Sequence, residues 1–355
     1  MVTIHDVAKR AGVSIATVSN VINNSNKVAK GTAERVKKAI YELNYIPNNV
    51  AKGLKMNSTR TIGILAEDIS AFSSPDIIDG ICEQCERSDY QINLANLRVN
   101  NKVNQNSEDM YRDLAEDKEF RKGIQDGQNT LLSARISALI YIGVHPRDVS
   151  GLLPQIYIPM VYTYCYAKNP ASSKAQNINY DDFQGAKLAV EYLIKRGHSK
   201  IAIIGGVINS YSTHRRMMGY QTALMEHSLP LRPEYITTGN WMFESGYEQM
   251  NKLIQLSDPP TAVFVMNDLM SYGAIAACKE HNINVPNDIS IHGYDNQESA
   301  PFVTPPLTTI ALPLHRMGVM AAKSAIDMVE HRNMDQTTEA SVLIPCHHVI
   351  RSSVR

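Results

Sequence analysis

Short apolar runs alternate with amphipathic patterns along most of this chain, from Thr61 towards its end. The apolar runs predict strands at 62–65, 91–94, 138–142, 160–164, 201–204, 262–265 and 289–293. Apolar residues spaced three and four positions apart predict helices at 75–88, 183–196, 215–227, 244–256, 268–281 and 314–331. Strands that alternate with helices are typical of parallel βαβ units, and seven such units exceed one compact sheet. We therefore expect an α/β body of two Rossmann-like lobes.

Residues 99–137 interrupt this alternation. Four asparagines, Asn100, Asn101, Asn104 and Asn106, are followed by a charged run at 108–125. Because the stretch is longer than one crossover helix needs, we interpret it as a surface insertion.

The first 22 residues predict two short helices around a tight turn. Thr3 precedes the first helix and Asp6 lies three residues on, so that both side chains can satisfy backbone amides at the helix start. Gly12 supplies the positive φ that ends this helix, and the Ser14 side chain can cap the next one at the amide of Thr17. Such a pair is typical of an all-α helix-turn-helix head, whose second helix enters the major groove of DNA.

The two helices each have an apolar inner face. It consists of Ile4, Val7 and Ala8 in the first helix and of Val18, Val21 and Ile22 in the second. The outer face of the second helix consists of Ile15, Ala16, Thr17, Ser19 and Asn20. Small and polar side chains at the start of a second helix suit contact with base edges, although an ordinary surface helix pair would show the same pattern.

A third helix is predicted at 30–44, with Val36, Ile40 and Leu43 on its inner face and Ala29 at the usual cap position. A short amphipathic segment at 45–55 and a linker at 56–60 follow. Gly53 lowers the helix propensity of this segment, which would fold best against a binding partner.

The charge distribution separates a basic head from an acidic body. Residues 1–60 contain ten Lys or Arg and three Asp or Glu, although the formal net charge of the whole chain is zero. The rest of the chain therefore holds 25 basic and 32 acidic residues. This asymmetry indicates that only the head is meant for a polyanion.

The five cysteines are odd in number and scattered, which fits reduced thiols in a cytoplasmic protein. Cys82-x-x-Cys85 lies in a helical pattern without a second pair, and Cys346-His347-His348 lies in a strand-like run whose alternate side chains face opposite sides. We therefore expect no metal site. No apolar run approaches membrane-spanning length and no leader pattern begins the chain, so we expect neither a membrane segment nor export.

Spaced motifs extend along the whole chain. They are Asp6-Val7-Ala8, Gly12-Val13-Ser14, Thr17-Val18-Ser19, Tyr45-Ile46-Pro47-Asn48, Gly197-His198, Arg216-x-x-Gly219-Tyr220, Asn267-Asp268, Gly293-Tyr294-Asp295 and Pro305-Pro306-Leu307-Thr308-Thr309-Ile310. In this combination the chain resembles the lactose-repressor/galactose-repressor family of bacterial transcription regulators. The resemblance implies a body similar to periplasmic binding proteins and a homodimer that binds near-palindromic double-stranded operator DNA.

The resemblance implies DNA contacts from the head and from a hinge at 47–55 that becomes helical in the minor groove. The matching residues are Thr3, Ser14, Ile15, Ala16, Thr17, Ser19, Asn20, Asn23, Asn48, Ala51, Lys52, Leu54 and Lys55. Leu54 matches a leucine that wedges into a central base step, and an apolar side chain on a marginal basic helix can open such a step unless it packs on its own body. Asn20 departs from the arginine of many members, and asparagine best matches the N6 and N7 edge of adenine.

The resemblance also implies a small effector between the two lobes. The matching residues are Phe72, Tyr164, Tyr180, Ser212, Arg216, Trp241, Asn267 and Asp295, at or near the carboxyl ends of predicted strands, where open α/β sheets place ligands. Arg216 and Asp295 can form hydrogen bonds to vicinal hydroxyls, and Trp241 offers a flat face to a sugar. Structural roles remain open: Arg216 can pair with a structural carboxylate, Trp241 can belong to the core, and Asp268 fits a helix cap.

Two departures from the family pattern bear on the effector. Tyr164 stands where sugar-responsive members frequently carry aspartate, and Ser210 stands where purine-responsive members carry arginine. Since the second departure argues more strongly against a purine than the first argues against a sugar, we favour a carbohydrate. A member that responds to another protein through the 99–137 stretch is the alternative.

We expect a helix-turn-helix domain at 1–46, a hinge and linker at 47–60, a first lobe at 61–163 and 313–333, and a second lobe at 164–312 and 334–355. The chain lacks the leucine-heptad tail of tetrameric relatives, so we expect a dimer with contacts from the helix at 77–85, which carries Cys82. No cofactor is expected, because Gly205-Gly206 lacks the dinucleotide spacing and neither a P-loop nor a nucleophile elbow occurs. An enzyme is therefore disfavoured, and a solute-binding protein would need an export signal and no basic head.

Overall fold

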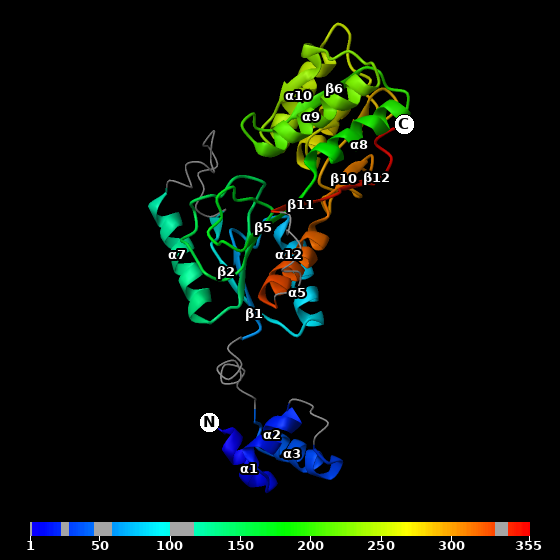
Figure 1. Cartoon of the computed structure of the whole chain (residues 1–355). Coiled ribbons are helices and arrows are strands. Elements are labelled where there is room, and N and C mark those ends of the chain that lie inside the picture. The colour runs from blue at the N-terminus through cyan, green and yellow to red at the C-terminus, as the bar shows by residue number, and fades with distance from the viewer. Residues whose placement is uncertain (1, 23–27, 46–58, 100–116, 331–339) are drawn as a thin grey trace. The chain divides into compact units, whose positions relative to one another are not determined.

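The computed structural model describes residues 2–22, 28–45, 59–99, 117–330 and 340–355. The chain divides into two compact units, Met1–Thr59 and Arg60–Arg355, which correspond to the predicted head and body (Figure 1). Predictions for Asn23 and for the hinge residues Asn48, Ala51, Lys52, Leu54 and Lys55 lie outside the described residues.

The described part of the head folds into α1 (Ile4–Ala11), α2 (Ile15–Ile22) and α3 (Lys30–Glu42). Their common core consists of Val7, Ala8, Ala11, Val18, Val21, Val36 and Ala39. Ala29 occupies the N-cap of α3. Its methyl side chain has no acceptor, so α3 lacks a side-chain cap hydrogen bond. The predicted inner faces of the three helices are therefore confirmed.

Local hydrogen bonds cap the start of α1 and build the turn from α1 into α2. The carboxylate of Asp6 accepts from the backbone N–H of Thr3 at 2.8 Å and from its hydroxyl at 2.7 Å. Gly12 ends α1 with φ 65°, a value that L side chains rarely adopt. The backbone N–H of Thr17 then donates to Ser14 Oγ at 3.2 Å. The predicted cap of α1, its end at Gly12 and the cap of α2 at Ser14 are therefore all present.

The first lobe of the body holds a six-stranded parallel sheet. Its order is β11 (Ser341–Ile344), β5 (Ala175–Tyr180), β4 (Met160–Thr163), β3 (Ala138–Ile142), β1 (Thr61–Ala66) and β2 (Gln91–Asn96). The helices α5 (Ser74–Arg87) and α12 (Leu314–Val329) cover one face, and α7 (Lys118–Ser133) covers the other (Figure 1). The central strands are buried on both faces, which explains their continuous apolar runs.

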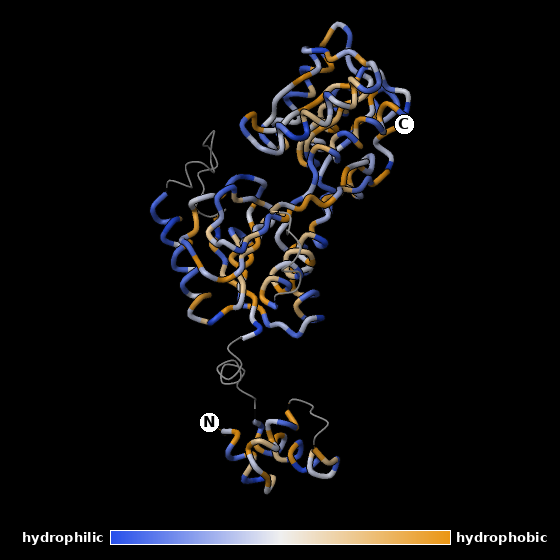
Figure 2. The backbone as a smooth tube through the Cα atoms, in the orientation of Figure 1, coloured by the Kyte–Doolittle hydropathy of each residue, from blue (hydrophilic) through white to orange (hydrophobic). Residues whose placement is uncertain are grey.

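The second lobe holds a four-stranded parallel sheet. Its order is β7 (Ile236–Thr238), β6 (Ile201–Gly205), β8 (Ala262–Val265) and β9 (Ser290–His292). The surrounding helices are α8 (Asp182–Lys195), α9 (Tyr211–Glu226), α10 (Phe243–Ile254) and α11 (Asp268–Glu280), with a short 3-10 helix at Pro233–Tyr235. The antiparallel pair β10 (Thr309–Ala311) and β12 (His347–Val349) packs beside α8. The apolar segments gather inside both lobes (Figure 2).

The lobe boundaries differ from those predicted. β5 and β11 belong to the first sheet, whereas the predicted boundaries put both in the second lobe. β5 escaped prediction because three of its six residues, Gln176, Asn177 and Asn179, are polar and disfavoured in strands, although Gln176 and Asn179 are buried here. The chain therefore passes from one lobe to the other after Tyr180, between β10 and α12, and between β11 and β12.

The interpretation of 99–137 as a surface insertion is wrong for its second half. Residues 118–133 form α7, whose side chains Phe120, Ile124 and Leu131 are buried against the first sheet. Asp117 caps this helix by accepting from the backbone N–H of Phe120 at 2.6 Å. The charged outer face concealed the helix, because only one residue in three or four is apolar.

Each lobe has one helix pair that crosses at two glycines. A Cβ atom on Gly80 of α5 would overlap the His315 carbonyl oxygen of α12, and one on Gly318 would overlap the Ile77 carbonyl oxygen. In the second lobe, Gly246 of α10 and Gly273 of α11 approach the partner backbone in the same way. These close contacts fix the positions of the helices that flank each sheet. On α5, Ile77, Ile81 and Cys85 lie in the core, whereas Cys82 is partly exposed.

No helix in the described ranges is long and apolar enough to span a membrane. The five cysteines, all within those ranges, are free thiols.

Candidate functional site

The outer face of α2 is the candidate DNA-contacting surface. Ser14, Ile15 and Ala16 are exposed, as is Thr3 before α1, while Thr17, Ser19 and Asn20 are partly buried. α2 itself carries no acidic residue at its first turn. Exposed cations on the flanking helices are Lys9, Arg10, Lys30, Arg35, Lys37 and Lys38, of which Arg10 pairs with Glu42. This head presents small and polar side chains on a basic background.

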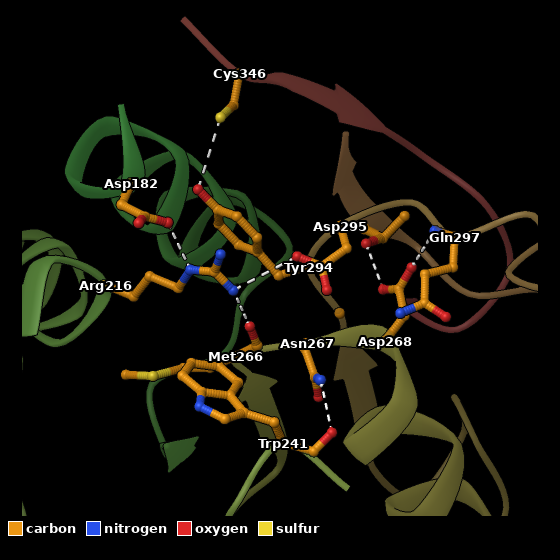
Figure 3. Close-up of polar contacts among 12 residues, drawn as sticks. Asp182, Arg216, Trp241, Met266, Asn267, Asp268, Tyr294, Asp295, Gln297 and Cys346 are labelled. Atoms are coloured by element: carbon orange, nitrogen blue, oxygen red, sulfur yellow. Dashed lines mark hydrogen bonds and ion pairs between the residues drawn. The ribbon is translucent and has the colours of Figure 1, made fainter. Parts of the chain in front are cut away.

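The centre of the candidate effector site is Arg216, which is 3% exposed in α9 (Figure 3). Its Nε donates to Asp182 Oδ1 at 2.6 Å, and its Nη1 lies 3.6 Å from Asp295 Oδ1. Its Nη1 also donates to the Met266 carbonyl oxygen, and its Nη2 donates to the Tyr180 hydroxyl at 3.3 Å. The guanidinium therefore lies where β5, β8 and β9 end.

Two aromatic rings flank this guanidinium. Its central carbon lies 3.7 Å from the ring centroid of Tyr294 and 5.6 Å from that of Trp241. Trp241 has φ 73° and packs over Gly206, where any side chain would overlap the indole. The indole is partly exposed, so it belongs neither wholly to the core nor wholly to solvent.

A second row of aromatic rings comes from the first lobe. The rings of Tyr164 and Tyr180 are 5.7 Å apart, and Phe72 packs edge-on to Tyr164 at 6.3 Å. Phe72 is 46% exposed, whereas both tyrosines are buried. Tyr164 also has φ 55°, which explains why β4 ends one residue earlier than predicted. The row leads from the surface to the Tyr180 hydroxyl and Arg216.

The role of Asp268 differs from the predicted helix cap, and Asn267 takes that place. Asn267 caps α11, because its Oδ1 accepts from the Met270 backbone N–H at 2.9 Å while its Nδ2 donates to the Trp241 carbonyl oxygen at 2.9 Å. Asp268 is not the cap. Its buried carboxylate accepts from the Thr309 hydroxyl at 2.6 Å and from the Gln297 backbone N–H at 2.8 Å. It ties α11 to β10 and to the loop that carries Asp295.

Ser212 is buried in the first turn of α9, four residues before Arg216 on the same face. The helix begins at Tyr211, four residues earlier than predicted.

Burial sets the ionisation of this site. It raises the pKa of Asp295 well above its ordinary value, although the nearby guanidinium of Arg216 opposes the change. It raises the pKa of Asp268 to about 7 despite hydrogen bonds from Thr309, Gln297 and Tyr294 that lower it. Burial alone would lower the pKa of Arg216, but Asp182, with smaller contributions from Tyr180, Tyr294 and Asp295, raises it well above the ordinary value, so the guanidinium stays charged.

The structure thus brings together Phe72, Tyr164, Tyr180, Arg216, Trp241 and Asp295, with Asn267 supporting Trp241. Sequence reasoning missed Asp182, the carboxylate nearest to Arg216, and Tyr294, the ring nearest to its guanidinium. The tandem Asp181-Asp182 directly after β5 was the available signal. Across the described ranges, no group of three His, Cys, Asp or Glu side chains could hold a metal ion.

Two family models match the chain: bacterial regulatory proteins of the lacI family at residues 3–48, and a periplasmic binding protein-like domain at residues 190–354. The HTH-type transcriptional repressor PurR of Actinobacillus pleuropneumoniae serotype 3 is 36% identical over 358 residues, which cover 100% of this chain and 99% of that protein. The repressor of the same name from Vibrio atlanticus is 36% identical over 342 residues, which cover 96% and 95%. A solved lac repressor dimer, bound to operator and the anti-inducer ONPF, has a TM-score of 0.75 and 26% identity over 99% of this chain and 98% of that one.

Proposed function

The chain belongs to the lacI family of bacterial regulatory proteins, and we propose that it represses transcription by binding a near-palindromic operator under the control of a small effector held in its body. Whole-length relatives at 36% identity establish the membership, which confirms the resemblance and the fold class predicted from the sequence. The relatives are transcriptional repressors, and the chain is not an enzyme.

The observation that carries the DNA-binding role is the outer face of α2. Exposed Ser14, Ile15 and Ala16 lie on a three-helix head whose flanking helices expose cations. Because phosphate contacts supply affinity and small side chains allow close approach to base edges, this surface suits a major groove. A repressor of this kind acts on DNA in the cytoplasm.

We expect a homodimer, as in the lac repressor dimer bound to operator, with one head on each half-site. The hinge at 47–55 and the wedging role of Leu54 stay predictions, because both lie outside the described residues. In the helix proposed for dimer contact Ile77, Ile81 and Cys85 are buried, so the surface left for a partner comes from Ile78, Asp79, Cys82, Glu83 and Gln84.

A carbohydrate is the effector that we favour. Asp295 provides an acceptor for hydroxyl groups, and Trp241 provides a partly exposed aromatic face beside it. Ser210, in place of the arginine of purine-responsive members, supplies no cation. A protein effector that acts through the 99–137 stretch is the alternative. Calorimetry against carbohydrates and nucleobases separates the ligand classes, and binding of nucleobases alone would overturn the choice.

The DNA-binding role predicts a strong effect of charge on α2. From a pool of random duplexes the chain should select a near-palindromic site, and Ala16→Glu should then weaken binding to that site by more than about tenfold, because a carboxylate would face the phosphates. Gel-shift titration measures the change. Ala134→Glu makes the same substitution on an exposed residue of the body and should leave affinity unaltered. Equal binding by wild type and Ala16→Glu would contradict the assignment of this face.

Asn20 predicts the base at one position of the half-site. Asparagine forms a bidentate pair with the N6 and N7 edge of adenine, whereas arginine pairs with guanine, and each pair discriminates by about 1–3 kcal/mol. Asn20→Arg should therefore change the selected base from adenine to guanine at that position and leave the other positions unaltered. Selection and sequencing of bound duplexes test this, and an invariant guanine in contact with residue 20 of the wild type would refute it.

A further inference from the structure

The buried site around Arg216 has no net positive charge. Arg216, Asp182 and Asp295 are 3%, 2% and 9% exposed, so all three lie away from bulk water. One guanidinium faces two carboxyl groups, and the sum is minus one when Asp295 is ionised and zero when it carries a proton. In neither state does the site hold a spare cation.

The donors of Arg216 are already engaged by the protein. A guanidinium has five N–H donors in a fixed fork. Three of them donate to Asp182 Oδ1, the Met266 carbonyl oxygen and the Tyr180 hydroxyl, and Nη1 also faces Asp295 Oδ1 at 3.6 Å. The ring of Tyr294 covers one face of the group. An incoming phosphate or carboxylate would therefore compete with Asp295 for the guanidinium, although arginine holds such groups best through two parallel donors that no other acceptor faces.

Hydrogen-bond acceptors, in contrast, have capacity to spare. Asp182 Oδ2 is buried and has no hydrogen-bond partner among the described residues. Asp295 meets Arg216 only at 3.6 Å, which is an ion-pair distance rather than a hydrogen bond. The other charged groups that act on Asp295 are the carboxylates of Asp268 and Asp182. The surroundings of the site thus favour a ligand that donates hydrogen bonds.

The energetic difference between ligand classes is large. A buried anion without a counter-ion loses its hydration and gains no opposite charge in return. An uncharged molecule with hydroxyl or N–H groups avoids this loss and satisfies acceptors that otherwise stay unpaired. Discrimination of this kind comes from unpaired polar groups as much as from new contacts.

We propose that the effector carries no negative charge and binds by donating hydrogen bonds to Asp295, so that phosphorylated sugars, nucleotides and carboxylic acids are excluded. This inference rests on the proposed function, in which the cluster around Arg216 is the effector site. It narrows that function to uncharged ligands such as free sugars.

Trp241 makes the proposal measurable, because it is the single tryptophan of the chain and lies in the site. Its fluorescence can be followed while the full chain is titrated with charge-matched pairs of probes, namely glucose and glucose 6-phosphate, cellobiose and cellobionate, and adenosine and adenosine monophosphate. In every pair of which one member binds, the uncharged member should bind at least about tenfold more tightly. Tighter binding of an anionic member would overturn the proposal.

A second measurement needs no knowledge of the effector. Iodide and caesium quench tryptophan by collision, and their relative efficiency reports the sign of the local charge at constant ionic strength. For Trp241 the ratio of iodide to caesium quenching should not exceed that of N-acetyl-tryptophanamide. A higher ratio would show a positive site and overturn the proposal, even if no probe of the panel binds.

The control variant is Trp241→Phe combined with Tyr157→Trp, since Tyr157 is fully exposed on the body. The quenching of the tryptophan that replaces Tyr157 in this variant reports the electrostatic potential of the acidic body surface alone. Comparison with Trp241 of the wild type separates that potential from the potential of the site. If an anionic probe binds at the site and releases operator, the charge inference fails while the repressor function stands. If the site has the expected charge and no ligand alters operator binding, the effector function fails instead.

Discussion

Asp182→Ala should lower the free energy of unfolding of the body by about 3–5 kcal/mol, because it leaves the guanidinium of Arg216 buried without its nearest counter-ion. The Asp182 carboxylate accepts from Arg216 Nε at 2.6 Å, and both groups are almost completely buried. The second carboxyl group, Asp295, is 1 Å farther from the guanidinium than Asp182 and cannot replace this bond. Urea unfolding followed by circular dichroism measures the loss.

Asp181→Ala is the matched control for this prediction. Asp181 is the adjacent carboxylate, but it caps α8 by accepting from the backbone N–H groups of Phe183 and Gln184 at 3.1 Å and lies 3.8 Å from Arg215. Loss of a cap costs about 1 kcal/mol. The double variant Asp182→Ala/Arg216→Met removes both charges and should recover much of the loss. If Asp182→Ala and Asp181→Ala destabilise the body equally, the pair does not have the role described here.

The same pair shows what the sequence can and cannot predict. The capping of α1 by Thr3 and Asp6 depends on residues three positions apart, so local chemistry was enough to predict it. The contact between Asp182 and Arg216 joins positions 34 residues apart, and the chain offers many carboxylates that could have been the partner. Only the packing of α8 against α9 selects Asp182.

Periodicity explains the outcome for the fold. The central strands of both sheets were predicted because burial on two faces demands uninterrupted apolar runs. α7 was missed because its outer face is polar, and β5 because it carries three polar residues, two of which are buried only by the packing of its neighbours. Of the antiparallel pair, β12 was indicated by the strand-like run at Cys346-His347-His348, whereas β10, only three residues long, is too short for a pattern to show.

The candidate site divides in a similar way. Arg216, Trp241 and Asp295 were located from spaced motifs, and the structure brings them together. The neighbouring helix cap was not predicted correctly. Asn267 rather than Asp268 caps α11, and the buried Asp268 carboxylate accepts a hydrogen bond from Thr309. Both residues are good cap formers in sequence, and their adjacent positions gave no means of choosing between them.

The second large effect concerns two buried histidines that join β9 to β12. The Nε2 atoms of His292 and His348 lie 2.8 Å apart, and His292 Nδ1 lies 2.9 Å from the Gly293 carbonyl oxygen. A carbonyl oxygen only accepts, so Nδ1 of His292 carries the proton, and its Nε2 must accept from Nε2–H of His348. A second proton on His292 would place two donors face to face. His292 therefore has to be neutral in the folded chain, and burial disfavours the charged form of His348.

Burial sets the corresponding pH dependence. It lowers the pKa of His292 to about 3, with the neighbouring His348 contributing, and it lowers the pKa of His348 to about 4. The ordinary value in the unfolded chain is near 6.5. Below that value the unfolded chain binds protons that the folded chain does not, so the free energy of unfolding falls as pH falls from 6.5 towards 4. Above pH 6.5 the two histidines are neutral in both states, so protonation no longer lowers the free energy of unfolding.

We expect the wild type to lose about 2 kcal/mol between pH 7 and pH 5.5 relative to the double variant His292→Leu/His348→Leu, whose apolar pair does not titrate. Most of this comes from His292, because the partial exposure of His348 to solvent reduces its share. The comparison with the variant removes the opposite contribution of Asp268, whose raised pKa makes the fold more stable as pH falls through 7. Urea unfolding at a series of pH values measures both curves, and His281→Gln, a substitution of an exposed histidine, should track the wild type. Parallel curves for the wild type and the double variant would show that the two rings are not held neutral by the fold.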